Sequence, residues 1–358
     1  MSSFKQIKLN PVFLIIIALL LFAVGCEGPA GPDGIDGIDG TDITGSECLV
    51  CHNDDVLLEK RFELNQHLHA TFPNSLSRGT SSGCGRCHSH ESFLTYVETG
   101  ETATLPSVTA LTCKSCHTLH STTEADSFSF DLRATAAVEY LTGNTETFGD
   151  GAASNTCIVC HSPRRDYMAY DDTESGTDSV IVTSSHAGPH YGMTGSLIFG
   201  VGADDRNGTI ALDQGPGTHA SEGCVTCHMG ENRNHMFTPE VDNCTSCHAG
   251  VDDMDINGAE TAIHEAVHAI ELVLATRGAL EVDEDDGSFG IALPDSVWDA
   301  TNEEWDPAIL LSGVEYSAFW NYLMLHSDGG YAFHNPPFVK AVINNMEENL
   351  GMTLTTWE

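Results

Sequence analysis

One five-residue pattern constrains this chain more than any other feature: CxxCH, two cysteines three positions apart followed at once by histidine. It occurs six times, as Cys48-Cys51-His52, Cys84-Cys87-His88, Cys113-Cys116-His117, Cys157-Cys160-His161, Cys224-Cys227-His228 and Cys244-Cys247-His248. The six copies use every cysteine except Cys26. The spacing suits two thioether bonds to one porphyrin, with the adjacent histidine as proximal iron ligand. The pattern therefore predicts six covalently attached haem c groups.

Zinc sites and structural disulfides also use paired cysteines, but neither requires histidine at the fifth position. Histidine accounts for 18 of the 358 residues. Six chance occurrences at that one position have a probability on the order of 10⁻⁸, so the haem interpretation is strongly favoured.

The segment between the first and last motifs lacks the periodicity of a conventional core. From Glu47 to about Gly250 it is rich in Gly, Ser, Thr, Asn and Asp, with little sustained helical or strand pattern. We expect the porphyrins to supply much of the buried apolar surface instead. The fold class predicted is a multihaem cytochrome c, mostly coil with short helices around a packed haem chain, over residues 47–250.

The last hundred residues differ from this segment. Helices are predicted over Ala259–Gly278, Val314–His326 and Pro337–Leu350, the last closed by Gly351. We expect a helical C-terminal segment, residues 251–358, that packs on the haem core.

The N-terminus has the layout of a secretory signal over residues 1–25. Lys5 and Lys8 precede an apolar run over 12–24, which is too short to span a bilayer comfortably. Ala23-Val24-Gly25-Cys26 resembles a bacterial lipoprotein signal, which implies acylation of Cys26; a plain signal peptide is the alternative. Export from the cytoplasm is predicted in either case.

Glycines at 28, 31, 34, 37 and 40 follow Cys26 in a Gly-x-y register. With so few prolines, residues 26–46 are predicted to be a lipid anchor and extended tether, with trimerisation as the alternative.

Charge limits the possible partners. Lys and Arg total 14 against 52 Asp and Glu, a formal net charge of -38, which repels phosphate backbones and anionic lipid head groups. Nucleic acid is excluded as a natural partner, and membrane contact is expected only through a lipid at Cys26.

Twelve histidines lie outside the six motifs, twice the number that six second axial positions require. Several occur in short sequence motifs, called phrases below: His69-Ala70, Thr118-Leu119-His120, His190-Tyr191-Gly192, His219-Ala220, His235-Met236-Phe237-Thr238-Pro239, and Asp328-Gly329-Gly330 leading to His334-Asn335-Pro336. With the motifs, these phrases resemble the multihaem outer-surface cytochromes of bacteria and archaea, including Omc-type proteins whose subunits polymerise into conductive filaments.

The resemblance implies distal haem ligation by the histidines of these phrases. They are His69, His120, His190, His219, His235 and His334. His67 remains a rival to His69, and His186 to His190. His90, His264, His268 and His326 are expected at the surface or in packing. With histidine in surplus we expect His/His ligation at every iron and low reduction potentials, leaving Met229 and Met236 as core filling.

A weaker signal is the first half of a calcium loop, Asp253 to Gly258, whose twelfth position holds His264 instead of glutamate. A Ca²⁺ site is one interpretation and a helix-capping turn is the other.

The function predicted is extracytoplasmic electron transfer, from redox partner proteins to extracellular or outer-membrane acceptors in anaerobic respiration, without enzymatic catalysis. One alternative is an oxyanion reductase, which needs an open iron. Related reductases often mark that haem with lysine in place of histidine, and no such motif is present. The other alternative is a filament subunit, which the acidic surface and a lipid anchor disfavour. We expect an outer-membrane or cell-surface lipoprotein, or an extracellular protein.

Overall fold

The computed structural model describes residues 54–71, 76–118, 131–170, 179–184, 186–212, 214–283, 285–292, 298–299, 304–305 and 309–354. Several predictions lie outside these ranges: the leader with Cys26, the Gly-x-y tether, the first haem motif (Cys48, Cys51 and His52) and His120.

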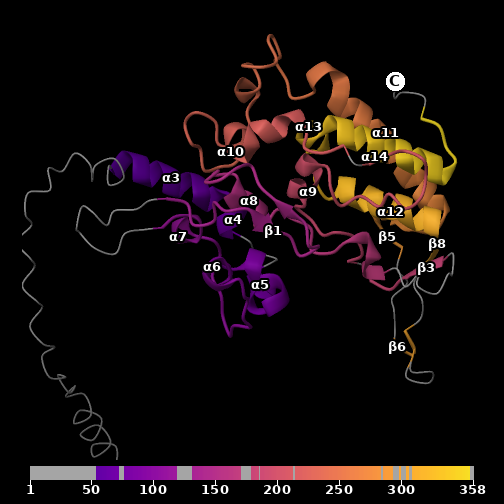
Figure 1. Cartoon of the computed structure of the whole chain (residues 1–358), viewed down its shortest axis with the longest axis horizontal. Coiled ribbons are helices and arrows are strands. Elements are labelled where there is room, and N and C mark those ends of the chain that lie inside the picture. The colour runs from indigo at the N-terminus through magenta and orange to yellow at the C-terminus, as the bar shows by residue number, and fades with distance from the viewer. Residues whose placement is uncertain are drawn as a thin grey trace, which may run out of the picture. The chain divides into compact units, whose positions relative to one another are not determined.

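Short helices and turns form the part of the chain that carries the haem motifs (Figure 1). The helices are α3 (Asp54–Gln66), α4 (Leu68–Thr71), α5 (Ser82–His88), α6 (His90–Thr99), α7 (Cys113–Cys116), α8 (Asn155–Ile158), α9 (Thr194–Phe199) and α10 (Gly223–His228). Five 3-10 turns accompany them: η1 (Leu76–Thr80), η3 (Tyr167–Tyr170), η5 (Thr218–Ser221), η6 (Val241–Asn243) and η7 (Ile256–Gly258). Long coil segments join these elements, which confirms the prediction of mostly coil with short helices in this part of the chain.

Strands are few and short. Four antiparallel pairs are described: β1 (Val138–Glu139) with β2 (Thr145–Glu146), β3 (Ser179–Val182) with β8 (Ile309–Ser312), β4 (Leu280–Val282) with β5 (Phe289–Ile291), and β6 (Trp298–Asp299) with β7 (Glu304–Trp305). The β3–β8 pair, in which Val180 lies opposite Leu311, joins segments far apart in the sequence. It ties the haem-bearing part of the chain to the C-terminal helices.

Three longer helices pack together near the C-terminus: α11 (Ala259–Thr276), α12 (Gly313–His326) and α14 (Pro336–Leu350), with the short α13 (Tyr331–His334) before α14. Each lies within one or two residues of its predicted range, because local signals set the ends. Ser312 and Glu315 form a capping box at the start of α12. Gly351 adopts φ +65° after α14, the left-handed conformation that glycine favours at a helix end.

The main apolar core lies among these helices. Residues 316–325 of α12 are all buried, so this helix has no solvent-facing side over ten residues. Its largest members are Trp320, Tyr316, Tyr322 and Phe319. Full burial of a large apolar side chain contributes about 1.5–3 kcal/mol, so this cluster is a strong, conventional source of stability.

The haem-bearing part has a smaller buried cluster around Phe93, Tyr140, Ile158 and Phe199. Asn335, which is buried at the start of α14, connects this part of the chain to the C-terminal helices. Its Nδ2 donates to the carbonyl oxygens of Leu197 and Gly215, each over 3.1 Å. The two parts are therefore joined by specific hydrogen bonds as well as by packing.

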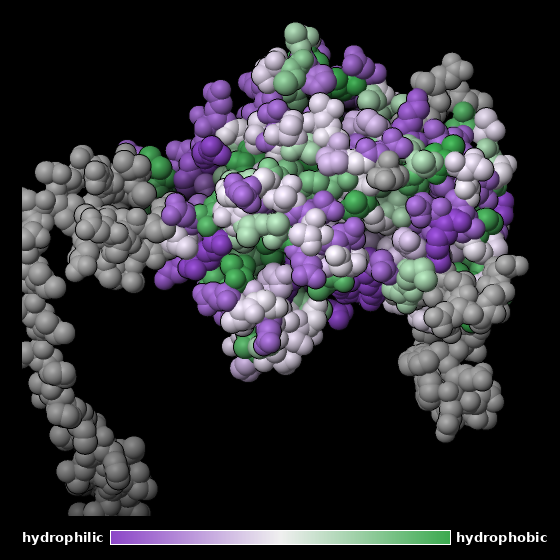
Figure 2. Space-filling view, in the orientation of Figure 1, coloured by the Kyte–Doolittle hydropathy of each residue, from purple (hydrophilic) through white to green (hydrophobic). Residues whose placement is uncertain are grey.

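Hydrophobic side chains on the face seen in Figure 2 lie in separate patches among polar ones. Within the described ranges, the helices are all too short or too polar to cross a membrane.

Candidate haem centres

Each described CxxCH motif folds into about one helical turn. In the motifs ending at His117, His161 and His248, the histidine amide donates over 2.9 Å to the carbonyl oxygen of the first cysteine. Residues i, i+3 and i+4 share a helix face, so both sulfurs and the imidazole lie on one side of the turn. The ten described cysteines form no disulfide with one another. This local geometry fits thioether attachment to a porphyrin with the histidine beneath the iron.

A second histidine faces each of the five described motif histidines. The ring centres are 6.0 Å apart for His161 and His69, 6.1 Å for His88 and His190, 6.2 Å for His248 and His219, and 6.3 Å for both His117 with His235 and His228 with His334. Metal–imidazole bonds are about 2 Å long, so two rings bound to one iron have centres about 6 Å apart. All five separations match this value.

Every proposed distal histidine within the described residues thus lies opposite a motif histidine. The rivals lie elsewhere. The His67 ring is tilted by 51° against the His69 ring, with centres 4.6 Å apart, and its Nδ1 accepts a hydrogen bond from the His69 amide. His186 is exposed. His90 bonds the Ser115 hydroxyl over 2.8 Å.

The remaining histidines lie on the C-terminal helices beside glutamates. His264 lies 3.8 Å from Glu260, and His268 lies 3.1 Å from Glu271. His326 approaches Glu271 from α12, at 3.6 Å. These three rings are exposed and each pairs with a glutamate, which for His268 and His326 is the buried Glu271.

Burial keeps several paired imidazoles neutral, the form that binds a metal. It lowers the pKa of His69 to about 3 and that of His190 to about 4, with help from neighbouring positive or titratable groups. Burial also lowers the pKa of His161 and His228. These rings therefore present unprotonated nitrogens at neutral pH.

His334 has different surroundings. Burial alone lowers its pKa, but the adjacent Asp328 carboxylate outweighs burial and raises it. For Asp328 itself burial raises the pKa, yet the His334 charge and the Thr194 hydroxyl outweigh that effect and lower it. Asp328 is therefore a buried carboxylate paired with the ring.

Hydrogen bonds from Nδ1 orient the paired rings and leave Nε2 for the iron. His228 donates to the carbonyl oxygen of Phe237 and His235 to that of Arg233, each over 2.8 Å. His219 donates to the carbonyl oxygen of Phe333. Sequence patterns could not identify these acceptors, because main-chain carbonyls belong to every residue.

Backbone strain is concentrated at the same places. Among the described residues, the non-glycine positions with positive φ are His190 (94°), Arg233 (52°), Phe237 (52°) and Asn257 (59°). One of these is a facing histidine, and two supply the carbonyl oxygens that orient imidazoles. Such conformations cost of order 1 kcal/mol or more and persist only where surrounding structure holds them.

The motifs also contact one another. The Cys87 sulfur lies 3.9 Å from the carbonyl oxygen of Cys160, and the Cys160 sulfur lies 3.7 Å from that of Arg86. Cys157 and Cys224 are within hydrogen-bonding reach through their thiols. Asn243, next to Cys244, donates over 2.7 Å to the carbonyl oxygen of Cys227.

The sequence patterns predicted no role for Arg86, which lies inside the second motif. It is 5% exposed, and its Nε donates over 2.9 Å to the carbonyl oxygen of Val159, in the fourth motif. Its guanidinium also lies 4.3 Å from the centre of the Tyr96 ring. An arginine between two haem cysteines thus joins two haem loops, and only the tertiary structure reveals it.

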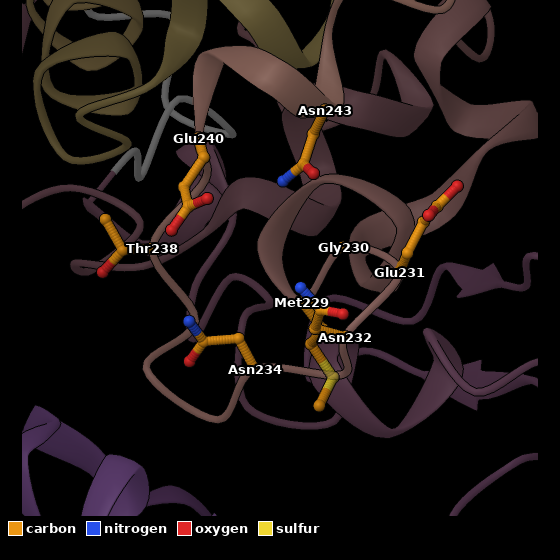
Figure 3. Close-up of a pocket in the computed structure, with 8 residues that line it drawn as sticks. All are labelled: Met229, Gly230, Glu231, Asn232, Asn234, Thr238, Glu240 and Asn243. Carbon is orange, nitrogen blue, oxygen red and sulfur yellow. The ribbon is translucent and has the colours of Figure 1, made fainter.

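Two cavities adjoin the last motifs. One of about 400 Å³ is lined by His219, Cys247, His248 and Pro336, among others, so it borders both rings of a facing imidazole pair and an attachment cysteine. Its volume and lining fit a porphyrin edge. The other, about 70 Å³, lies in the loop after His228, with Glu231 and Glu240 in its wall (Figure 3). Its carboxylates disfavour an anionic substrate.

The suspected calcium loop has another role. Asp255 accepts hydrogen bonds from the amide of Glu260 over 2.8 Å and from the hydroxyl of Thr261 over 2.6 Å. It therefore caps the start of α11, as in the capping interpretation. The part of the chain that the structure describes holds no group of three or more His, Cys, Asp or Glu side chains suited to a metal ion. The calcium prediction is unsupported.

Comparisons with known proteins find relatives over part of the chain. No protein family profile matches it. It is 27% identical over 279 residues to the C-type polyheme cytochrome OmcB of Geobacter sulfurreducens, covering 65% of this chain and 36% of that protein. It is 27% identical over 239 residues to OmcC of the same organism, covering 56% and 30%. The chain thus spans about a third of the length of these relatives.

Among solved structures, the outer cell wall cytochrome OcwA aligns with a TM-score of 0.47 and 19% identity, over 80% of this chain and 49% of the other. The relatives identified by sequence are polyheme c-type cytochromes, the class of protein that the CxxCH motifs of this chain predict. The chain is accordingly similar to multihaem c-type cytochromes of the Omc type.

Proposed function

We propose that the chain conducts electrons through six covalently attached haems, each ligated by two histidines. The observation that carries this proposal is the set of five facing imidazole pairs with centres 6.0–6.3 Å apart. The ligand pairs would be His88 with His190, His117 with His235, His161 with His69, His228 with His334, and His248 with His219. His52 and His120, both outside the described residues, would form the sixth pair.

Ligation of every iron by two histidines would restrict these centres to electron transfer. A haem supplies an iron that cycles between ferric and ferrous states, and full axial ligation leaves no position for a substrate. The protein's residues hold the imidazoles through hydrogen bonds to main-chain carbonyl oxygens, such as those from His228 and His235. This rigidity favours electron transfer, because the ligands need little rearrangement when the charge changes.

Contacts between motifs support a continuous path. The second motif contacts the fourth through Cys87 and Cys160, and the fourth approaches the fifth through Cys157. Asn243 then links the fifth motif to the sixth. We propose that the haems at these motifs lie in that order, close enough for direct electron exchange.

Carbon monoxide binding to the fully reduced protein tests the proposal. The haem content is measured by pyridine haemochrome analysis, and CO binding by visible absorption. We expect six haems per chain and no CO-induced spectral change. About one equivalent of rapid CO binding would instead reveal an open iron and favour an oxyanion reductase.

We further propose that the protein works outside the cytoplasm, anchored by a lipid at Cys26, and passes electrons from redox partner proteins to acceptors at or beyond the cell surface. Labelling with a fatty-acid analogue tests the anchor, and a Cys26→Ser variant should lose the label. We expect discrete particles in electron micrographs, because a net charge of -38 opposes end-to-end stacking. Ordered filaments would overturn that expectation.

A further inference from the structure

Asp328 is the partner of one facing imidazole and lies outside all six motifs. Its Oδ2 accepts a hydrogen bond from His334 Nδ1 over 2.6 Å. The carboxylate side chain is fully buried, and the ring is 17% exposed. A buried ion that touches one ring this closely has a much stronger effect on it than a surface charge.

The turn that carries Asp328 fixes this geometry. It follows α12 directly, where the Asp328 amide donates over 3.1 Å to the carbonyl oxygen of Leu325. Gly329 adopts φ +69°, which favours glycine. A Cβ on Gly330 would lie 2.8 Å from Cε1 of His334, so only glycine leaves room for the ring here. The backbone thus holds carboxylate and imidazole together.

The contrast with the other rings gives Asp328 its significance. His228, on the opposite side of the same proposed haem, donates to a neutral carbonyl, as do His219 and His235. A carboxylate acceptor makes a shorter and roughly twofold stronger bond, and it raises the electron-donating power of a metal-bound imidazole. Stronger donation and the nearby negative charge both favour ferric over ferrous iron.

We infer that Asp328 is a positioning residue that lowers the reduction potential of the haem between His228 and His334. This inference rests on the proposed ligation of that haem by these two histidines. It assigns a function to Asp328, the residue of the Asp-Gly-Gly turn that is not itself a proposed haem ligand. It also gives one haem of the chain a potential set separately from those whose ring donates to a carbonyl.

An Asp328→Asn variant tests the inference, because asparagine keeps the shape and an acceptor oxygen but removes the charge. Spectroelectrochemical titration should show one one-electron step moved to higher potential. We expect at least a tenfold change in its reduction equilibrium, which corresponds to about 59 mV. A His334→Met variant identifies the step, since axial methionine raises the potential of its own haem. The same step should move in both variants.

Glu231→Gln is the matched control. Glu231 is exposed and follows His228 by three residues, so its substitution also removes one charge near this haem without touching the ring. We expect its titration to follow that of the wild type. If the Asp328→Asn protein loses low-spin haem, Asp328→Ser is titrated instead, with the same expected direction.

An unshifted titration in a variant that retains six low-spin haems would overturn the inference, as would a shift of a step that His334→Met leaves in place. Failure of the proposed function would look different, because the wild-type protein itself would then contain fewer haems or bind CO.

Discussion

The junction between the second and fourth haem motifs should depend on Arg86. An Arg86→Met substitution keeps most of the side-chain volume and removes the charge. It abolishes the hydrogen bond from Nε to the carbonyl oxygen of Val159 and the contact of the guanidinium with the Tyr96 ring. The Val159 carbonyl oxygen then has no hydrogen bond from Arg86, within a buried contact between two haem loops.

The magnitude follows from these two interactions. A hydrogen bond from a charged donor contributes about 1.5–3 kcal/mol, and a partly desolvated cation–π contact about 0.5–2 kcal/mol. Relief of the cost of burying the guanidinium offsets part of the loss. We therefore expect Arg86→Met to lower the free energy of unfolding by about 2–4 kcal/mol.

Urea denaturation followed by far-UV circular dichroism measures this loss, at equal haem content. Arg78→Met is the control, because Arg78 lies eight positions earlier in the chain and is exposed. Its effect should stay within about 0.5 kcal/mol, as for most surface substitutions. An Arg86→Met protein as stable as the control would refute the view that this arginine fastens the two loops together.

Two further predictions concern the C-terminal helices and the turn between them. Gly330→Ala should displace the His334 ring and create partial CO binding at one haem in the reduced protein, whereas Gly83→Ala, where a methyl group has room, should create none. In Glu315, hydrogen bonds from Arg277 and Ser312 hold the pKa below its usual 4.5. Glu315→Gln should therefore lower stability by about 0.5–1 kcal/mol at neutral pH. That difference from wild type should disappear as the pH falls through the lowered pKa, as pH-dependent unfolding would show; a constant difference would contradict it.

Local features of the sequence were sufficient to predict the helices of the C-terminal segment. The Ser312–Glu315 capping box and Gly351 mark helix ends within a few residues of chain, so no tertiary information was needed. The CxxCH motifs are equally local. The predicted distal histidines within the described residues all face motif histidines, but their ligation of iron remains a prediction until haem content and CO binding are measured.

The surroundings of the imidazoles could not be predicted in the same way. Arg86 reaches a carbonyl in another motif, 73 residues away in the sequence. The Phe333 carbonyl meets His219 across 114 residues. Such pairings depend on how the loops pack around one another, and glycine- and serine-rich coil carries no periodic signal that would reveal it.

The apolar core of the C-terminal helices contributes directly to the candidate haem centres. Helix α13 supplies His334 and the Phe333 carbonyl that orients His219, so one imidazole at each of two proposed haems depends on its position. It is placed by the turn after α12, which carries Asp328, and by α14, whose N-cap residue Asn335 donates to a carbonyl oxygen of α9. A helical bundle with a well-packed core resists displacement far better than the described coil segments between the haem motifs. Imidazoles held by such a bundle keep a fixed geometry, and a reduction potential set by one buried carboxylate requires that constancy.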